Sequence, residues 1–331
     1  MKKKRPSLQD VADRVGVTKM TISRFLRNPE QVSEKLRGTI ARTLDELGYI
    51  PNRVPDILSN ATSRAIGVLL PSLTNQVFAE VIRGIETVTD AAGYQTMLAH
   101  YGYQAEKEED RLVSLLSYNI DGLILAERTH TPRTLKMLAT AGIPVVELMD
   151  SVSPCYDSAV GLDNRLASFE MTQAMIARGC RRVIYLGARH DERTFMRLQG
   201  YEQAMRDAGL EPGNVMTQES SSYSLGARQL HQVRADYPDA DGLFCTNDDL
   251  AIGAVFECQR LGIRIPQDLA VAGFHGHDVG RVMTPKLASV LTPRHLMGRR
   301  AAEVLLARLR GELPSQQIVD VGFELLPGES I

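Results

Sequence analysis

Long apolar runs are missing from this sequence. No stretch approaches the ~18 consecutive apolar residues that a membrane-spanning helix needs, and the basic start MKKKRPSLQD passes directly into polar residues. A secretory signal peptide would carry an apolar segment at that point. We therefore expect a cytoplasmic protein that is not exported and has no membrane partner.

Cysteine is scarce, and the motifs of common enzymes are absent. The four cysteines form no CxxC pair, which argues against a zinc knuckle and against a disulfide framework; they are Cys155, Cys180, Cys245 and Cys258. The sequence contains no Walker loop and no GxSxG, HExxH or GxGxxG motif. We therefore predict no catalytic residues, no metal and no cofactor, and a protein that is not an enzyme.

The small net charge of -2 hides an asymmetry along the chain. Residues 1–60 contain twelve Lys or Arg and seven Asp or Glu, a net charge of +5, so the remaining residues carry -7. A length of 331 residues also suits two or three domains better than one. Because partners sense local fields, the sequence predicts a small basic module for nucleic acid attached to a larger acidic body.

The basic module has the pattern of a helix-turn-helix. Ser7, followed three residues later by Asp10, begins a helix in which apolar residues recur at helical spacing. Gly16 ends this helix where a tight turn needs a positive φ, and Thr18 caps a second helix over about 19–27. A third amphipathic helix lies between a capping Ser33 and a terminating Gly48. Three helices can share one small core.

The outward residues near the start of the second helix are candidates for DNA contact. A recognition helix presents such residues to the major groove. We assign base-edge contacts to Lys19, Met20 and Arg24, and phosphate contacts to Thr21 and Ser23. The alternative is that these residues are only the solvated face of a small helical domain.

We expect residues 51–64 to form a hinge that becomes helical only when a partner orders it. Asn52 is placed to cap such a helix, but so short a helix is not stable alone in water, so DNA or a second subunit would have to order it. The segments LQDVADRVGVTKMTISRFLRNPEQVS and LGYIPNRV resemble the N-terminal region of the LacI/GalR family of bacterial repressors.

This resemblance implies that the hinge also binds DNA. In that family the paired hinge helices of a dimer enter the minor groove at the operator centre, and the leucine at the motif position of Leu58 wedges into a base step. We therefore add Asn52 and Leu58 to the DNA-binding residues. An ordinary linker leucine is the alternative, and Pro55 departs from the alanine frequent in the family, which weakens the expectation of a helix without DNA.

From residue 65 onward, strand-like apolar runs alternate with helical patterns. This alternation predicts parallel sheets covered by helices, and the length suits two doubly wound lobes. We expect an all-α helix-turn-helix domain over 1–50, the hinge, and a two-lobed α/β core over 65–331. The predicted N-lobe spans about 65–160 plus 292–320, and the predicted C-lobe spans about 161–291 plus 321–331.

Polar residues that follow the predicted strands are candidates for ligand binding, because ligands bind at the carboxyl ends of parallel strands. This rule selects residues 72–78, 127–130, Glu147, Asp150, 247–248 and His275. Arg128 and Glu147 are candidate effector-binding residues on the basis of this rule alone. The body also resembles the periplasmic-binding-protein-like core of the family. That resemblance implies that Arg197 grips the effector, Asn247 lies near it and Phe78 forms an apolar wall.

His275 stands where many sugar-binding members of the family carry an aspartate. Losing an acid and gaining a possible cation would suit an anionic ligand. Stretches such as PSLTNQVFAEVIRGIE and CTNDDLA resemble gluconate-responsive members of the family, which implies gluconate as the effector, followed by other aldonates such as idonate.

We therefore predict a homodimeric repressor of a palindromic operator that is released by a sugar acid. A family member that responds to another aldonate or to a neutral sugar is the first alternative. A sugar-metabolising enzyme and an exported sugar receptor are further alternatives. The first would need a catalytic or nucleotide motif and the second a signal peptide, and neither explains residues 1–60.

Overall fold

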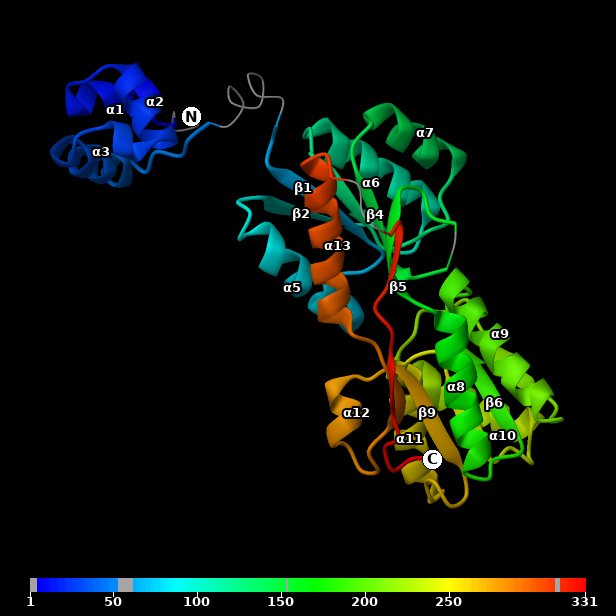
Figure 1. Cartoon of the computed structure of the whole chain (residues 1–331). Helices are drawn as coiled ribbons and strands as arrows, with labels where there is room; N and C mark the ends of the chain where they lie inside the picture. Colours follow the sequence, from blue (N-terminus) through cyan, green and yellow to red (C-terminus); the bar gives the residue numbers. More distant parts are fainter. Residues whose placement is uncertain (1–4, 53–61, 153, 313–315) are drawn as a thin grey trace. The chain divides into compact units, whose positions relative to one another are not determined.

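The computed structural model describes residues 5–52, 62–152, 154–312 and 316–331. The chain divides into two compact units, Met1–Ser63 and Arg64–Ile331 (Figure 1). The predicted hinge helix and its residues Pro55 and Leu58 fall within 53–61, outside the described residues. Within the described part of the chain, no helix combines the length and the apolar content that crossing a bilayer requires.

The first unit is built from short helices with local capping signals. It contains α1(Leu8–Val15), α2(Lys19–Arg27), the 3-10 helix η1(Pro29–Gln31) and α3(Glu34–Leu47). The Ser7 N–H donates to Asp10 Oδ2 at 2.7 Å, and the Asp10 N–H donates to Ser7 Oγ at 3.3 Å, which completes a capping box. Gly16 makes the turn to α2 with a φ of +79°.

The three α-helices of this unit enclose one small apolar core. Its fully or almost fully buried members are Val11, Ala12, Ile22, Val32 and Ile40. The predicted cap of α3 differs in detail, because Ser33 occupies the N-cap position but its side chain accepts no hydrogen bond from the helix. The predicted helix-turn-helix arrangement is otherwise present, with Thr18 capping α2 and Gly48 ending α3.

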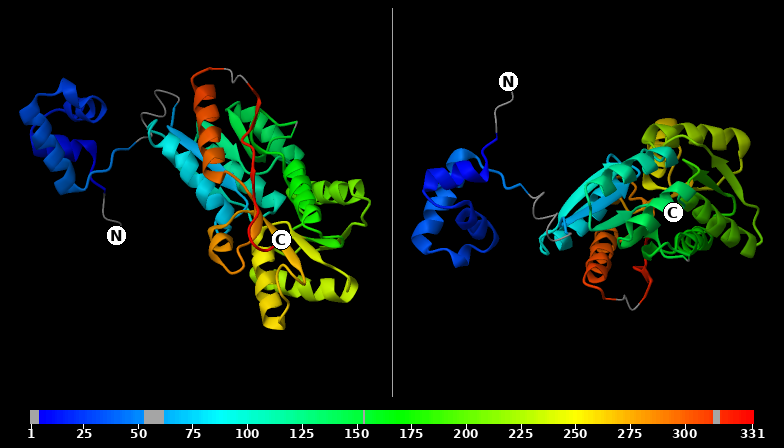
Figure 2. Two further views of the ribbon diagram at one scale, coloured as in Figure 1. Left: turned by 60° about the horizontal axis from the view of Figure 1, so that its bottom comes forward. Right: turned by 90° about the horizontal axis from the view of Figure 1, so that it is seen from above.

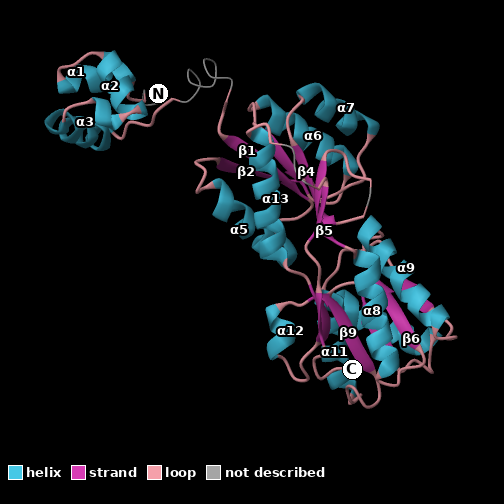
Figure 3. Cartoon of the chain, in the orientation of Figure 1, coloured by secondary structure: helices cyan, strands magenta, loops and turns pink. Residues whose placement is uncertain are grey.

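The second unit contains two sheets, one in each lobe (Figure 3). The N-lobe sheet has the order β11-β5-β4-β3-β1-β2, and its paired strands are all parallel. Its strands are β1(Ala65–Leu70), β2(Gln95–His100), β3(Gly122–Leu125), β4(Val145–Asp150), β5(Ser158–Leu162) and β11(Ile318–Asp320). One face carries α5(Gln76–Thr89) and α13(Arg294–Leu309), and the other carries α6(Ala105–Ser117) and α7(Pro132–Ala141) (Figures 1 and 2).

The C-lobe sheet repeats this design. Its order is β12-β10-β9-β8-β6-β7, and only the β10–β12 pair is antiparallel among the described strands. Its strands are β6(Val183–Gly187), β7(Gly213–Met216), β8(Gly242–Cys245), β9(Ala270–His275), β10(Ala288–Leu291) and β12(Glu324–Leu326). The helices α8(Asn164–Ala177) and α9(Glu192–Asp207) cover one face, α10(Tyr223–Asp236) and α11(Asp248–Leu261) cover the other, and α12(Asp278–Val282) follows β9. The predicted fold class is confirmed.

The chain crosses between the two lobes after β5, after β10 and after β11. Each sheet also reverses its strand order, between β1 and β3 in the N-lobe and between β6 and β8 in the C-lobe. Ligands of such sheets bind at these reversals, beyond the carboxyl ends of the strands. The topology therefore directs attention to the segments that follow β1, β3, β6 and β8.

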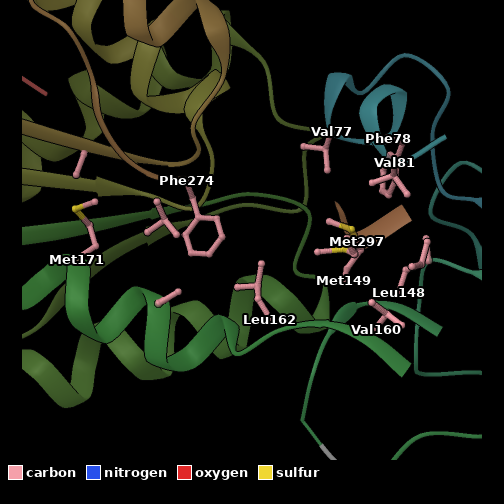
Figure 4. Packing of buried hydrophobic residues seen from close by; sticks show 14 of the residues in the cluster. Val77, Phe78, Val81, Leu148, Met149, Val160, Leu162, Met171, Phe274 and Met297 are labelled. Atoms are coloured by element: carbon pink, nitrogen blue, oxygen red, sulfur yellow. The ribbon is translucent and has the colours of Figure 1, made fainter. Parts of the chain in front are cut away.

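A single apolar cluster extends through both lobes. Figure 4 shows Phe78 beside Val81 in the N-lobe part, and Phe274 beyond Leu162 toward the C-lobe part. These side chains are almost fully buried. The cluster therefore packs beneath residues of both lobes.

Close backbone packing of α5 against α13 leads to a first prediction. A Cβ on Gly298 would lie 2.0 Å from the carbonyl oxygen of Val81, and a Cβ on Gly84 would lie 2.1 Å from that of His295. We expect Gly298→Ala to destabilise the core by roughly 3 kcal/mol because backbone cannot move away cheaply. Thermal unfolding of the core should show a midpoint lower by roughly 8 °C.

Gly38 provides the matched control. It lies in α3 and is exposed, and a Cβ added at this position would have no other atom within 4 Å. Gly38→Ala should stabilise the first unit by about 0.5–1 kcal/mol, because alanine is the better helix former. An unchanged unfolding midpoint for Gly298→Ala would contradict the packing argument.

Candidate functional site

Two adjoining cavities lie where the carboxyl ends of the strands of both lobes face each other. The smaller, with a volume of about 200 Å³, is lined by Glu127, Arg128, Asp150, Glu192, Arg193 and Met196. The larger, with a volume of about 640 Å³, is lined by Tyr101, Tyr103, Ala105, Glu108, Glu127, Thr129, Arg189, His190, Asp191 and Glu192. Both lobes contribute to each cavity, and Glu127 and Glu192 line both.

Arg197 is buried in the C-lobe, one helical turn after Arg193, and is held on several sides. It lines neither of the two cavities, whereas Arg193 lines the smaller one. Its Nε and Nη2 donate to Asn164 Oδ1 at 3.0 and 2.8 Å, and its Nη1 donates to the carbonyl oxygen of Thr246 at 2.6 Å. Its Cζ lies 3.7 Å from the centroid of the Phe274 ring, a cation–π arrangement. The guanidinium is therefore fixed in position before any ligand arrives.

The groups that accept hydrogen bonds from Arg197 are all neutral. Burial lowers the pKa of Arg197 to about 10, so the guanidinium stays protonated at neutral pH. Its neighbours differ: Arg128 pairs with Asp150 at 2.8 Å, and Arg193 pairs with Glu127 at 2.7 Å. Among the described residues, no carboxylate lies within ion-pair distance of Arg197, although the negative charge of Asp191 acts on it from farther away.

His275 ends β9 next to Arg197. Its Nε2 lies 3.4 Å from Arg197 Nη1, its Nδ1 lies 3.4 Å from Thr292 Oγ1, and its backbone has the unusual φ of +107°. Arg294 donates to its carbonyl oxygen, which helps to hold this conformation. Burial, assisted by the positive charge of Arg197, holds the pKa of His275 well below its usual value.

The suggestion that His275 supplies a cation is therefore wrong. A buried imidazole beside a guanidinium loses its proton because both low polarity and like charge disfavour the charged form. His275 presents a neutral ring, and only the loss of an acidic group at this position remains as an argument for an anionic ligand.

Asn164 connects the two lobes and was not predicted as a site residue. Its Oδ1 accepts from Arg197, while its Nδ2 donates to Asp150 Oδ2 at 3.2 Å and to the Met149 carbonyl oxygen at 3.0 Å. Asp150 in turn accepts from Arg128. A continuous path of hydrogen bonds thus runs from Arg128 in the N-lobe to Arg197 in the C-lobe.

Glu147 lies deeper in the N-lobe than its neighbour Asp150 does. It approaches His130 Nε2 at 3.4 Å and Arg128 Nε at 3.9 Å, and it accepts from the Tyr156 N–H at 3.0 Å. It does not line either cavity described above. Of the two acids that follow the strand-end rule on β4, Asp150 is the one placed at the cavity wall.

Phe78 and Asn247 are both buried, and each has a structural role. Phe78 on α5 belongs to the apolar cluster in Figure 4. Asn247 caps α11 by accepting from the Leu250 N–H at 3.2 Å, and its Nδ2 donates to Ser221 Oγ at 2.6 Å. The residue that contacts Arg197 after β8 is Thr246, through its backbone carbonyl oxygen.

His130 lies between two carboxylates, with its Nδ1 2.9 Å from Glu108 Oε1 and its Nε2 close to Glu147. Burial alone would lower the pKa of His130, but these two carboxylates raise it to about 9. In the folded protein, the His130 side chain is therefore the charged imidazolium at neutral pH. Its positive charge lies between Glu108 and Glu147 in the interior of the N-lobe.

This arrangement predicts a stability change at alkaline pH. Because the folded pKa of His130 is raised, its stabilisation is fully present below the unfolded value of ~6.5 and is lost as pH rises toward 9. The loss amounts to roughly 3 kcal/mol. Thermal unfolding between pH 7 and 9.5 should show this decline for the natural protein.

His130→Gln supplies the comparison, since glutamine keeps polar atoms but does not titrate. Its unfolding midpoint should be lower at pH 7 and should fall much less between pH 7 and 9.5. Parallel pH profiles for the two proteins would rule out the assigned charge state.

The candidate DNA-binding residues lie on one exposed helix of the first unit. Lys19, Met20 and Arg24 are exposed on α2, and the Met20 side chain is 69% exposed although it is apolar. Thr21 and Ser23 are half-buried, and Thr21 Oγ1 lies 3.1 Å from Thr18 Oγ1. The exposed side chains of Lys19, Met20 and Arg24 are therefore accessible to a partner.

The remaining predictions about the site concern Asn52, Leu58 and metal binding. Asn52 is described and exposed, while Leu58 lies outside the described residues. No group of three or more potential metal ligands occurs within residues 5–52, 62–152, 154–312 and 316–331. All four cysteines are free thiols, and three of them are buried.

Comparison with known proteins identifies the family. A model of bacterial regulatory proteins of the lacI family matches residues 7–52, and a periplasmic binding protein-like domain matches residues 172–331. The HTH-type transcriptional regulator GntR of Escherichia coli (strain K12) is 72% identical over 331 residues, with 100% of both chains covered. The chain belongs to the LacI family.

Solved structures of other LacI-family proteins share this architecture. A transcriptional regulator of the family from Silicibacter pomeroyi is 33% identical, has a TM-score of 0.91, and is matched over 98% of this chain and 99% of that chain. The lac repressor dimer bound to operator and the anti-inducer ONPF has the same fold, with a TM-score of 0.87, 21% identity and 99% coverage of both chains.

Membership in the LacI family confirms several predictions made from the sequence. The protein is a DNA-binding transcriptional repressor with an N-terminal helix-turn-helix, and its relatives are transcriptional regulators and not enzymes. The two cavities are therefore candidates for an effector site and not for an active site.

Proposed function

We propose that this LacI-family repressor binds a palindromic operator as a homodimer in the cytoplasm and is released by a sugar acid, in the first place gluconate. A single helix-turn-helix reads only one half-site, so a two-fold symmetric dimer fits a palindrome. The resemblance to gluconate-responsive members of the family supports the choice of effector. Full operator affinity of a monomer would contradict the dimer.

The observation that carries the choice of an anionic effector is the environment of Arg197. Its guanidinium is buried and charged, yet its contacts are the Asn164 amide, a backbone carbonyl, the Phe274 ring and neutral His275. A buried charge without an opposite charge is unfavourable. A ligand carboxylate at this position would supply the missing negative charge.

The effector would bind between the lobes, since both cavities have walls from each. We assign direct contacts to Arg128, which lines the smaller cavity, and to Arg197 and His275, which line neither cavity but belong to the same hydrogen-bonded group. Phe78 and Asn247 shape the surrounding wall. Glu147 acts indirectly, by helping to position Arg128. Because the hydrogen-bond path through Asn164 joins the lobes, a ligand that contacts it can bias their relative position.

A neutral sugar is the competing effector, because amide and carboxylate groups at the strand ends also bind hydroxyls. Operator binding measured by fluorescence anisotropy at one fixed salt concentration separates the two, since affinity for DNA depends strongly on salt. Gluconate should weaken operator binding, idonate should act similarly, and glucitol and glucose should have little effect. Release by glucitol but not by gluconate would overturn the proposal of an anionic effector.

The exposed residues at the start of α2 yield a further prediction. Met20→Ala and Lys19→Ala should change which operator bases are preferred, by about 1–3 kcal/mol at the base pair contacted, because side chains at the start of α2 read base edges. Thr21→Ala should instead weaken binding to all sequences alike. Selection from a randomised operator library measures both. Identical selected sites for all three variants would exclude α2 as the reading helix.

A further inference from the structure

The two lobes are joined across the cavities by an ion pair. Arg193 on α9 donates from Nη2 to Glu127 Oε1 at 2.7 Å and from Nη1 to the Ala126 carbonyl oxygen at 2.8 Å. Both side chains are mostly buried. Next to this pair, Thr129 Oγ1 donates to Glu192 Oε2 at 2.6 Å. The residues after β3 are thus fastened to the start of α9 without a ligand.

Arg193 and Arg197 are four residues apart on α9. Residues at this spacing lie on the same face of a helix, one turn apart. Burial is the main cause of the lowered pKa of Arg197, and the positive charge of Arg193 adds to it, so the two guanidinium groups are near enough to interact. One of them is neutralised by a carboxylate of the N-lobe and the other is not.

Glu127 occupies an unfavourable place for a carboxylate. Burial raises the pKa of Glu127, and the negative charges of Asp191 and Glu108 add to this effect, whereas Arg193 opposes it. The side chain also lines both cavities, so it stands where they meet. Its contact with Arg193 therefore lies at the shared boundary of the two cavities.

Tyr101 points to a ligand on the other side of this contact. The residue is 4% exposed, its hydroxyl has no hydrogen-bond partner among the described residues, and it lines the larger cavity. Burial raises the pKa of Tyr101 far above its usual value, so the hydroxyl is a neutral donor, and the charges of Glu127 and Arg193 both act on it. A buried hydroxyl without a partner is costly, and a polar atom of a ligand would satisfy it.

We propose that Glu127 is a built-in competitor for the carboxylate of the effector. Without ligand it neutralises Arg193. The carboxylate of an aldonate takes its place, bridges Arg193 and Arg197, and joins the two cavities so that a hydroxyl of the ligand reaches Tyr101. A neutral sugar has no charge to exchange for that of Glu127, so the same residue selects for acids. This inference rests on the proposed sugar-acid effector.

Isothermal titration of the full-length protein with gluconate tests the exchange. Glu127→Gln removes the competing charge and keeps the shape, so the dissociation constant for gluconate should fall by about tenfold. Arg193→Gln should raise it by at least about tenfold. In the double variant E127Q/R193Q the gain from E127Q should disappear, because there is no longer a guanidinium to release.

Glu219→Gln is the matched control, because Glu219 pairs with Arg228 on the exposed surface of the same lobe as Arg193. It should leave gluconate binding unchanged.

Glu127→Asp keeps the charge but shortens the reach to Arg193, so this variant too should bind gluconate more tightly than the natural protein. Thermal unfolding of each variant reports whether the variant is folded.

Several results would overturn the inference. Weaker or unchanged gluconate binding in folded E127Q would show that Glu127 does not compete. An equal gain in the double variant, or in Glu219→Gln, would show a general effect of charge. If the natural protein binds gluconate and the E127Q variant does not bind it more tightly, only this inference fails. If the unchanged protein binds no aldonate, the proposed function fails together with it.

Discussion

Replacing Arg197 by glutamine is expected to weaken gluconate binding by roughly 3 kcal/mol, about a hundredfold. The side chain is buried and its hydrogen-bond acceptors are neutral, so its charge is available for an anionic ligand. Glutamine retains a donor for Asn164 but has no charge. Operator release should therefore require about a hundredfold more gluconate, measured by anisotropy at fixed salt.

A second substitution of Arg197 separates the contribution of its charge from that of its hydrogen-bonding geometry. Arg197→Lys keeps a positive charge but loses the planar fork that donates to Asn164 and Thr246 together, so an intermediate loss is expected. Arg228→Gln is the matched control, since that guanidinium is exposed and already paired with Glu219. A fully responsive Arg197→Gln protein would remove this residue from the effector site.

Local signals were sufficient to predict the first unit. The capping box of Ser7 and Asp10, the turn at Gly16 and the end of α3 at Gly48 each depend on bonds between residues a few positions apart. Such features are encoded in short segments, so the sequence pattern determines them directly. Ser33 shows the limit, because a capping residue type does not guarantee that its hydroxyl turns toward the helix.

The core was predictable for a different reason. Each strand of a parallel sheet buried on both faces is a nearly continuous apolar run, and the polar residues that follow meet at one edge. This rule led to Arg128 and to the segment that contains Glu127. Applied to the run that forms β5, it would also have selected Asn164, which lies two residues after the end of that strand.

The long-range contacts of Arg193 and Arg197 were not predictable in this way. The partners of Arg193 and Arg197 lie more than thirty residues away, as with Asn164, Thr246 and Glu127. One of these partners is a backbone carbonyl, which carries no signal in the residue type. The neutral state of His275 likewise depends on burial beside Arg197, and residue type alone suggested the opposite.

A second large effect is expected in the first unit. Ile22 is fully buried on α2 and packs with Val11, Ala12 and Ile40. Ile22→Ala removes apolar contacts and leaves a cavity, at a cost of about 2–5 kcal/mol. A unit of about sixty residues has little stability to lose, so the helix-turn-helix should unfold and specific operator binding should fall by about a thousandfold or more.

The loss should be confined to DNA binding, because the apolar core around Ile22 is separate from the clusters of Arg64–Ile331. Gluconate titration of Ile22→Ala should therefore match the unchanged protein, while circular dichroism shows reduced helix content. Ile50→Ala is the matched control, since Ile50 is 74% exposed in the same unit and its truncation removes little packing. Loss of gluconate binding in Ile22→Ala would show that the two units do not fold independently, and that the effector site depends on an intact DNA-binding unit.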